Sequence, residues 1–560
     1  MGSKMKILYL SGVLLSVVLF NACGGVYGAR KMPAKQPLHF NMPADRPWLD
    51  EADMTRLDRQ LDGANILDIQ ALVTEGALSY ERLTLYYLQR IRDYDNKLNS
   101  IIELNPEALE LARSRDNERN EQKTKHGEVP LMYGIPVLLK DNISTAGQLH
   151  TTAGALAMKG FAAGKDAKLV TRLRESGAII LGKANLSEWA NAMADQAPNG
   201  YSALGGQTRN PYRLSLNVGG SSSGSAVSVA AEFSTVSIGT ETSGSIINPS
   251  SLNSVYGMRP GGNLVPQDMV IPITDHLDTP GPMARNITDL AITLSVIASG
   301  QTDYREFLDP DKVRERKLRI GFAVNLPSYD GREFDLDDEQ LAALKDLFDR
   351  AGIAFLPIEY QPQFGEALQN GFFSAFYQGL RTDIETYFVQ AGVDFPIGKL
   401  RDIVNFNMLD PDLAIPYGQG QFIAALSQED QSPEELERVF LAGRTEAIAD
   451  MEAMFRSGGS EPPDIVAGVG NSLSLQYVMA DYTALSVPIG YGGALGGSYE
   501  KGFRPLNITL VSKAGSEGIL IAAAYALERQ LEQLETDSEH RESGLGPRKR
   551  PALVFRKSEE

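Results

Sequence analysis

The sequence predicts an α/β fold in which helices cover a largely buried sheet. Apolar runs of strand length alternate along the chain with segments whose apolar residues recur at helical spacing. Such alternation is typical of a sheet with helices on both faces. No repeat and no long linker interrupts residues 50–530, which favours one large domain over two. We therefore expect the folded domain to span residues 49–534.

The first expected elements begin near Trp48. Residues 66–93 predict two helices that break near Gly76, and residues 97–115 predict a similar helix. The stretch GIPVLLKDN, residues 134–142, follows as an apolar run of strand length that ends on a lysine.

The later elements repeat the helix-to-strand order. Residues 168–185 (KLVTRLRESGAIILGKAN) predict a helix, a glycine stop and a strand. Residues 226–233 predict the next helix and residues 234–242 the next strand. Further strands are expected at 318–324 and 464–468.

The composition excludes several classes of function. The 560-residue chain is 43% hydrophobic and 22% charged, with a net charge of −18 and a pI near 4.9. Because an acidic surface repels the phosphate backbone, we expect no nucleic-acid partner. The single cysteine, Cys23, cannot form an internal disulfide, and no Cys/His cluster predicts a zinc site. We expect no metal and no cofactor.

The N-terminus predicts export. Lys4 and Lys6 precede the apolar run 7–20, which is too short to span a bilayer comfortably and fits a signal-peptide core. The run leads into LFNACG, which resembles a bacterial lipobox, in which Cys23 is lipidated after cleavage. A plain secretory signal with an incidental cysteine is the alternative. We predict an exported protein whose membrane contact is a lipid anchor at Cys23.

Three segments lie outside the predicted domain. Residues 1–23 combine the leader with Met1–Lys4, which precede what resembles a natural start at Met5. Residues 24–48 contain four prolines and predict a tether. Residues 535–560 are charged and predict a loose tail.

A segment rich in serine and glycine, residues 219–249, raises the question of chemistry. A flexible linker is one interpretation, but Val227, Phe233 and Ile238 give this segment the apolar pattern of a helix and a strand. A phosphate-binding loop lacks support, because no Gly-Lys-Ser/Thr ending is present. A serine nucleophile fits better, and the small residues lie where backbone N–H groups are free to bind an anion.

A serine nucleophile needs a base. The histidines nearest in sequence, His150 and His276, lie outside the segment. Lys140 ends a buried strand candidate, and burial lowers the pKa of a lysine so that its neutral amine can accept a proton. Taken alone, Lys140 fits a salt bridge with Asp141, or an exposed position at a strand end, better than a catalytic role, and the serine segment reverses that order.

Three motifs in order, GIPVLLKDN, GGSSSGSA and GTETSGSIINP, resemble the amidase signature family. The resemblance covers most of residues 60–530. The segments LVTRLRESGAIILGKANLSEWAN, GGQTRNPYR and DTPGPMARNITDLA are most similar to the bacterial peptide amidase branch. The resemblance implies a single α/β/α sandwich around a large, twisted, mixed sheet. It also implies catalysis by a Ser–cis-Ser–Lys triad.

The resemblance assigns roles to individual residues. Lys140 matches the catalytic lysine, Ser221 the bridging serine that follows a cis peptide bond, and Ser245 the nucleophile. In the implied mechanism Lys140 draws a proton through Ser221 from Ser245, which attacks an amide carbonyl and forms an acyl-enzyme.

The backbone N–H groups before the nucleophile are expected to form the oxyanion hole, at Thr242, Ser243 and Gly244. At Ser243 the peptide amidase branch carries an acidic residue that meets the substrate. The predicted function is hydrolysis of a carboxylic or peptide C-terminal amide. An esterase, carbamate hydrolase or aryl-acylamide hydrolase with the same triad is one alternative, and a non-catalytic binding lipoprotein is another.

Aromatic residues are frequent in residues 364–425 and predict either an apolar wall for a small-molecule substrate or packing of a helical region. The loop Tyr417-Gly418-Gln419-Gly420-Gln421 is the best local candidate for lining the substrate. Within it we select Tyr417 and Gln419, and we add Asn191 at the end of LSEWAN.

Overall fold

The computed structural model describes residues 37–40, 47–194, 196–324, 338–360, 364–428, 432–457, 461–491 and 505–536. The predicted leader with Cys23, most of the tether and the tail beyond residue 536 lie outside the described residues and stay predictions. Among the helices in these ranges, none combines the length and apolar character needed to cross a membrane.

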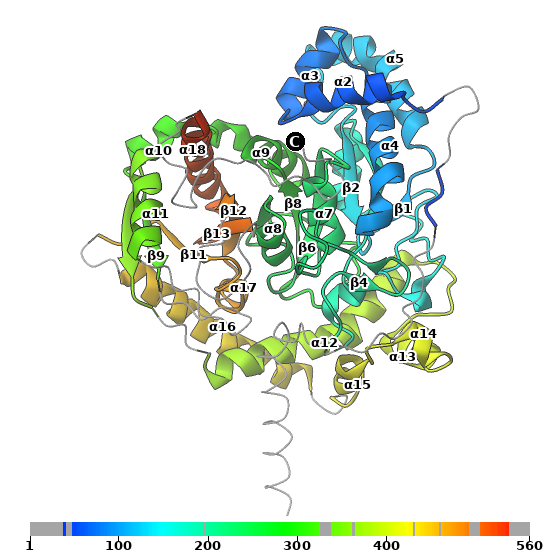
Figure 1. The fold of residues 1–560 in the computed structure, drawn as a ribbon. Coiled ribbons are helices and arrows are strands. Elements are labelled where there is room, and N and C mark those ends of the chain that lie inside the picture. The colour runs from blue at the N-terminus through cyan, green and yellow to red at the C-terminus, as the bar shows by residue number, and fades with distance from the viewer. Residues whose placement is uncertain are drawn as a thin grey trace, which may run out of the picture.

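An eleven-stranded sheet forms the centre of the molecule, in the order β1-β3-β2-β6-β8-β7-β12-β13-β11-β9-β10 (Figure 1). Parallel and antiparallel neighbours are both present, so the sheet is mixed, as predicted. Its strands are β1 (Ile101–Leu104), β2 (Pro136–Lys140), β3 (Ile179–Ala184), β6 (Val236–Glu241), β7 (Tyr256–Arg259), β8 (Thr279–Ala284), β9 (Arg319–Ala323), β10 (Ala354–Ile358), β11 (Ile465–Val469), β12 (Thr483–Tyr491) and β13 (Pro505–Ser512). A separate two-stranded ribbon pairs β4 (Tyr201–Ser202) with β5 (Gly206–Gln207).

Helices surround this sheet, with α12 and α16 packed together along the lower edge of the view in Figure 1. The described helices are α2 (Glu51–Leu61), α3 (Ile66–Thr74), α4 (Tyr80–Leu98), α5 (Ala108–His126), α6 (Lys168–Glu175), α7 (Ser223–Ala230), α8 (Ile247–Leu252), α9 (Ile287–Ile297), α10 (Pro310–Arg316), α11 (Asp338–Arg350), α12 (Glu366–Ala391), α13 (Leu400–Asn407), α14 (Pro411–Ala414), α15 (Gly420–Leu426), α16 (Pro433–Arg456), α17 (Ser474–Met479) and α18 (Glu517–Thr536). Three short 3-10 turns are η1 (Leu156–Met158), η2 (Glu188–Asn191) and η3 (Tyr304–Phe307).

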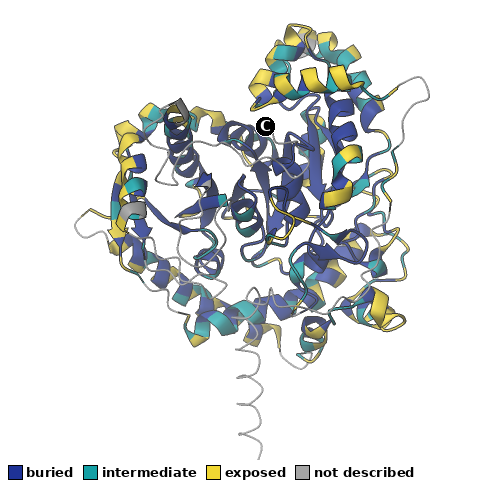
Figure 2. Ribbon diagram, viewed as in Figure 1, coloured by how far each residue is buried: buried dark blue, intermediate teal, exposed yellow. Residues whose placement is uncertain are grey.

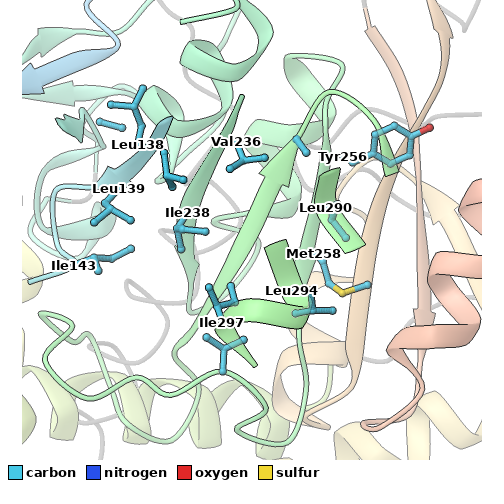
Figure 3. Packing of buried hydrophobic residues seen from close by; sticks show 14 of the residues in the cluster. Leu138, Leu139, Ile143, Val236, Ile238, Tyr256, Met258, Leu290, Leu294 and Ile297 are labelled. Atoms are coloured by element: carbon cyan, nitrogen blue, oxygen red, sulfur yellow. The ribbon is translucent and has the colours of Figure 1, made fainter. Parts of the chain in front are cut away.

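The core lies where the sheet meets the helices on its faces. Figure 3 shows buried residues of one cluster from three elements, among them Leu138 of β2, Ile238 of β6, and Leu290 and Leu294 of α9. Burial is concentrated in the sheet and declines toward the outer helices (Figure 2). Strands buried on both faces carry continuous apolar runs, which is why β2 and β3 could be located from sequence.

Most predicted elements are present, and one prediction is wrong. The two helices of residues 66–93 are α3 and α4, and the strands expected at 318–324 and 464–468 are β9 and β11. The helix expected over 97–115 does not exist as one element. Asn99 ends α4 in a left-handed conformation, and β1 follows, paired with β3. The apolar residues of β1 also fit helical spacing, so only pairing with a distant strand decides their conformation.

Candidate active site

The sheet brings the lysine motif and the serine motif together. Strand β2 is parallel to β6, with Leu139 opposite Ile238, so their carboxyl ends lie at the same edge. Lys140 is the last residue of β2, and Thr240 lies near the end of β6. Parallel strands end at the same edge of a sheet, which is the usual place for functional groups in α/β proteins.

Lys140 lies among oxygen atoms in the protein interior. Its Nζ is 2.7 Å from Ser221 Oγ, 2.8 Å from Thr240 Oγ1 and 3.1 Å from the Thr240 carbonyl oxygen. Burial lowers the pKa of Lys140 to about 7, against the opposing effect of the negative charges of Asp278 and Glu241. A large fraction of this amine is therefore neutral near pH 7.

The salt bridge considered between Lys140 and Asp141 is not formed. Asp141 instead accepts hydrogen bonds from the Thr152 hydroxyl and from the backbone N–H groups of Thr152 and Gly154. Burial raises the pKa of Asp141 to about 6, and the positive charge of Lys183 on β3 is the largest effect that opposes this rise. Lys140 and Asp141 therefore contact different groups, although they are neighbours in sequence.

Hydrogen bonds tie the start of α7 to the segment that carries Ser245. The peptide bond between Gly220 and Ser221 is cis. The Ser222 N–H donates to the Ser245 carbonyl oxygen at 3.0 Å, and the Ser222 hydroxyl donates to the Thr240 carbonyl oxygen. Ser222 makes no side-chain cap to α7, so its hydroxyl supports the strand end and not the helix.

The backbone before Ser245 presents free donors. In the part of the chain that the structure describes, the N–H groups of residues 242–245 donate no hydrogen bond. Gly244 has a φ of 76°, and a Cβ built there would lie 2.3 Å from Asn471 Nδ2. Both observations require glycine at this position. The four N–H groups have the character of an anion site next to Ser245.

A buried carboxylate, Glu241, holds this backbone in place. One of its oxygens accepts the N–H groups of Ile246 and Ile247, at 2.7 and 2.9 Å. The other accepts the hydroxyl of Tyr477 at 2.8 Å and lies 3.8 Å from Arg259 Nε. The carbonyl oxygen of Ser245 is therefore held by Ser222, and the backbone just after Ser245 is held by Glu241.

Ser245 faces a cavity of about 90 Å³. None of the described residues that line it is Asp, Glu, Lys, Arg or His. Its polar wall consists of hydroxyls and amides, and its apolar wall is mainly three phenylalanines of α12. The lining residues are Ala190, Asn191, Asn199, Gly220, Thr242, Ser243, Ser245, Asn248, Ile273, Phe372, Phe373, Phe376, Gln421 and Asn471.

The three predicted substrate residues lie in different places. Asn191 lines the cavity, at the end of a turn in which it and the two preceding residues all have left-handed φ values. Tyr417 lines a smaller neighbouring cavity that shares Asn191 with the first. Gln419 lines neither cavity. It is buried and accepts a hydrogen bond from Asn407 at 3.0 Å, whereas Gln421, two residues later, faces the cavity.

The histidines considered as bases lie elsewhere. His150 bonds to Glu103, and His276 lies beside Glu437 and Phe440. Of the aromatic residues in 364–425, Phe372, Phe373 and Phe376 line the cavity, whereas Tyr387, Phe388 and Phe395 pack around Phe161. Both interpretations of the aromatic region thus apply, to different residues.

Sequence reasoning did not single out several residues of this site. Thr240 contacts Lys140, Asp278 accepts the hydroxyl of Thr242, and Asn248 and Asn471 line the cavity. Thr240 and Asn248 lie within GTETSGSIINP, so this motif could have marked them as candidate site residues. Asn471 comes from a loop after β11 and has no local signal, because only the sheet order brings it here.

Comparison with known proteins gives one family. The amidase family model matches residues 82–385. The chain is 32% identical over 492 residues to a probable amidase from Arabidopsis thaliana, covering 83% of this chain and 90% of that protein. It is 28% identical over 507 residues to a glutamyl-tRNA(Gln) amidotransferase subunit from Caldanaerobacter subterraneus, covering 84% and 97%. The native peptide amidase from Stenotrophomonas maltophilia superposes with a TM-score of 0.72 at 34% identity, covering 84% and 97%.

Proposed function

The chain belongs to the amidase family, and we propose that it hydrolyses uncharged carboxamides, including the C-terminal amides of peptides, through Lys140, Ser221 and Ser245. The observation that carries the proposal is the 2.7 Å contact between Lys140 Nζ and Ser221 Oγ in the protein interior. A lysine with a pKa near 7 and a hydroxyl partner is suited to receive a proton at neutral pH.

The reaction begins with proton transfer. Neutral Lys140 takes the proton of Ser221, and Ser221 takes the proton of Ser245 as its oxygen attacks the amide carbonyl. The relayed proton then passes to the leaving nitrogen, so ammonia or an amine departs neutral and an acyl-enzyme forms at Ser245. Water attacks this ester by the same relay, and the carboxylic acid is released.

Negative charge develops on the carbonyl oxygen during each attack. The free N–H groups of residues 242–245 supply donors for that oxygen, and Glu241 holds the backbone just after them through the N–H groups of Ile246 and Ile247. Donors that are already oriented need no reorganisation as the charge appears, which is why such groups contribute strongly to the rate.

The cavity supports a substrate without charge near the scissile bond. A charged group that enters loses its hydration, and none of the described lining residues offers a counter-ion. Peptide groups match the amide side chains of the polar wall, and the three phenylalanines suit an apolar or aromatic acyl part.

The same argument disfavours glutamine as the substrate. Free glutamine carries both an ammonium and a carboxylate, which the described lining residues do not neutralise. The role of an amidotransferase component is therefore less well supported than that of a hydrolase, although the chain is similar to such a protein. Esters, carbamates and aryl-acylamides suit the same relay and stay alternatives.

The test measures ammonia release from an N-acetylated dipeptide amide ending in phenylalanine amide and from free glutamine, with Ser245→Ala as the blank. We expect release from the peptide amide only, and a loss of at least about 10⁴-fold in Ser245→Ala, as for other serine nucleophiles. Glutamine as the better substrate would contradict the uncharged-substrate proposal.

Labelling by a fluorophosphonate probe separates the alternatives. If the peptide amide is inert but Ser245 is labelled, the substrate shifts to N-substituted amides or esters. If the parent neither releases ammonia nor is labelled, a binding protein without catalysis is the better interpretation.

A further inference from the structure

The end of the β6–β8 pair connects two walls of the cavity. The strands are antiparallel, and Glu241 pairs with Thr279 at the end of the ladder. One step further, Thr242 and Asp278 therefore lie opposite each other. Thr242 belongs to the segment with the free N–H groups. Asp278 is at the end of the loop that contains Ile273, and both Thr242 and Ile273 line the cavity.

The carboxylate of Asp278 joins these two walls by hydrogen bonds. One oxygen accepts the hydroxyl of Thr242, and the other accepts the N–H groups of Ile273 and Thr274, at 2.7 and 3.1 Å. Three donors converge on two oxygens, and the ionised carboxylate accepts all three. An asparagine removes the negative charge, and its NH₂ group fits only on the Thr242 side, where the hydroxyl has to turn and accept.

The same carboxylate acts on Lys140 through space. Asp278 is the larger of the two charges that hold the pKa of Lys140 up against burial, and Glu241 is the other. Burial raises the pKa of Asp278 itself to about 7, and the nearby charge of Asp275 contributes to the rise. Asp275 in turn lies beside Asp383 of α12 and near His276.

We propose that Asp278 is a positioning residue of the reaction. It fixes Thr242 to the Ile273 wall and thereby the backbone donors that receive the oxyanion. Its negative charge also stabilises Lys140 in the protonated form that arises while Ser245 is deprotonated. The proposal rests on the amide hydrolysis proposed above, and the two can fail separately, because Ser245→Ala tests the first without any change at Asp278.

The experiment compares Asp278→Asn with Thr242→Val on the N-acetylated dipeptide amide. In Asp278→Asn we expect kcat to fall by about ten- to a hundredfold with KM changed less than about threefold, as when a group acts mainly in the transition state. Without the negative charge the pKa of Lys140 falls further, so the acid limb of the kcat/KM profile moves to lower pH. Thr242→Val keeps the carboxylate, so kcat falls while the acid limb stays in place.

Asp268→Asn is the matched control, since Asp268 is an exposed carboxylate of the same loop that bonds only the N–H of Lys168 in the described structure. It should retain the parental kcat and pH profile. A parental kcat in Asp278→Asn overturns the whole proposal. A reduced kcat with an acid limb at the parental pH overturns its electrostatic part. If Asp278→Asn does not fold, Thr242→Val decides the positioning part, and a parental kcat there overturns it.

Discussion

The two sides of the cavity are built in different ways. On the sheet side, Lys140, Thr240 and the segment around Ser245 are held by strand pairing and by hydrogen bonds to backbone atoms. On the helical side, α12 supplies Phe372, Phe373 and Phe376, whose rings contact one another, and α15 supplies Gln421.

The difference indicates that the sheet side performs proton transfer and the helical side recognises the acyl group. Directional bonds between strand ends fix atoms to within tenths of an ångström, which proton transfer requires. Packing of aromatic rings is less directional and tolerates change of shape, which suits recognition of an acyl group. We therefore expect changes on the sheet side to lower kcat, and changes on the helical side to raise KM.

The strongest test of this division is Lys140→Met. Methionine fills a similar volume but cannot accept a proton, so we expect kcat to fall by at least about 10³-fold. In the parent, the pKa of Lys140 near 7 makes kcat/KM decline as the pH falls through 7, because protonation removes the base. Steady-state rates from pH 5 to 9 measure both effects.

Lys183→Met is the matched control. Lys183 is also a buried strand lysine, on β3, with a pKa lowered by burial to about 8, but its Nζ bonds to the Ile143 carbonyl oxygen and Thr151 Oγ1, away from the cavity. This variant should lose thermal stability and keep the acid limb near pH 7. If the acid limb disappears in Lys183→Met, the pH dependence belongs to Lys183, and its assignment to Lys140 is wrong.

A smaller effect is expected on the helical side, in Phe376→Ala. Removing a ring from the apolar wall should raise KM for the phenylalanine-containing amide by about tenfold, the order expected for part of a buried aromatic side chain, with kcat within about threefold. Phe388→Ala is the control, because Phe388 lies on the same helix but packs on Phe161. A change in kcat alone for Phe376→Ala would contradict the division between the two sides.

Predictability from sequence follows the same division. The strands and serine-rich turns of the sheet side are local in sequence, so β2 and β6 could be located from their patterns. The roles of Lys140, Ser221 and Ser245 came from the family resemblance that their motifs carry. Glu241 was visible in GTETSGSIINP, but its role depends on Tyr477 and Arg259, which only the fold brings close.

The helical side was harder to predict for a physical reason. A helix with apolar residues around most of its circumference gives no periodic signal for which face meets the cavity. In α12, Phe372, Phe373 and Phe376 face the cavity, whereas Tyr387 and Phe388 pack inside the protein. The sequence around these aromatic residues does not distinguish the first group from the second. The strand β1 shows the same limit, because its conformation depends on β3, which lies far away in sequence.

The smallest expected effect separates two glutamines at the start of α15, Gln419 at its N-cap and Gln421 in its first turn. Gln421 faces the cavity and accepts the hydroxyl of Tyr377 at 2.8 Å, so Gln421→Ala should raise KM for the peptide amide by about two- to tenfold, the size of one hydrogen bond. Gln419 bonds to Asn407 in the interior, so Gln419→Ala should lower the midpoint of thermal unfolding and leave KM unchanged. Because the two residues are of one type and lie two positions apart at the start of α15, we expect any difference between the variants to come from the direction of the side chain. Equal KM values in both would mean that the start of α15 lies outside the bound substrate, and the helical side would then act through its phenylalanines alone.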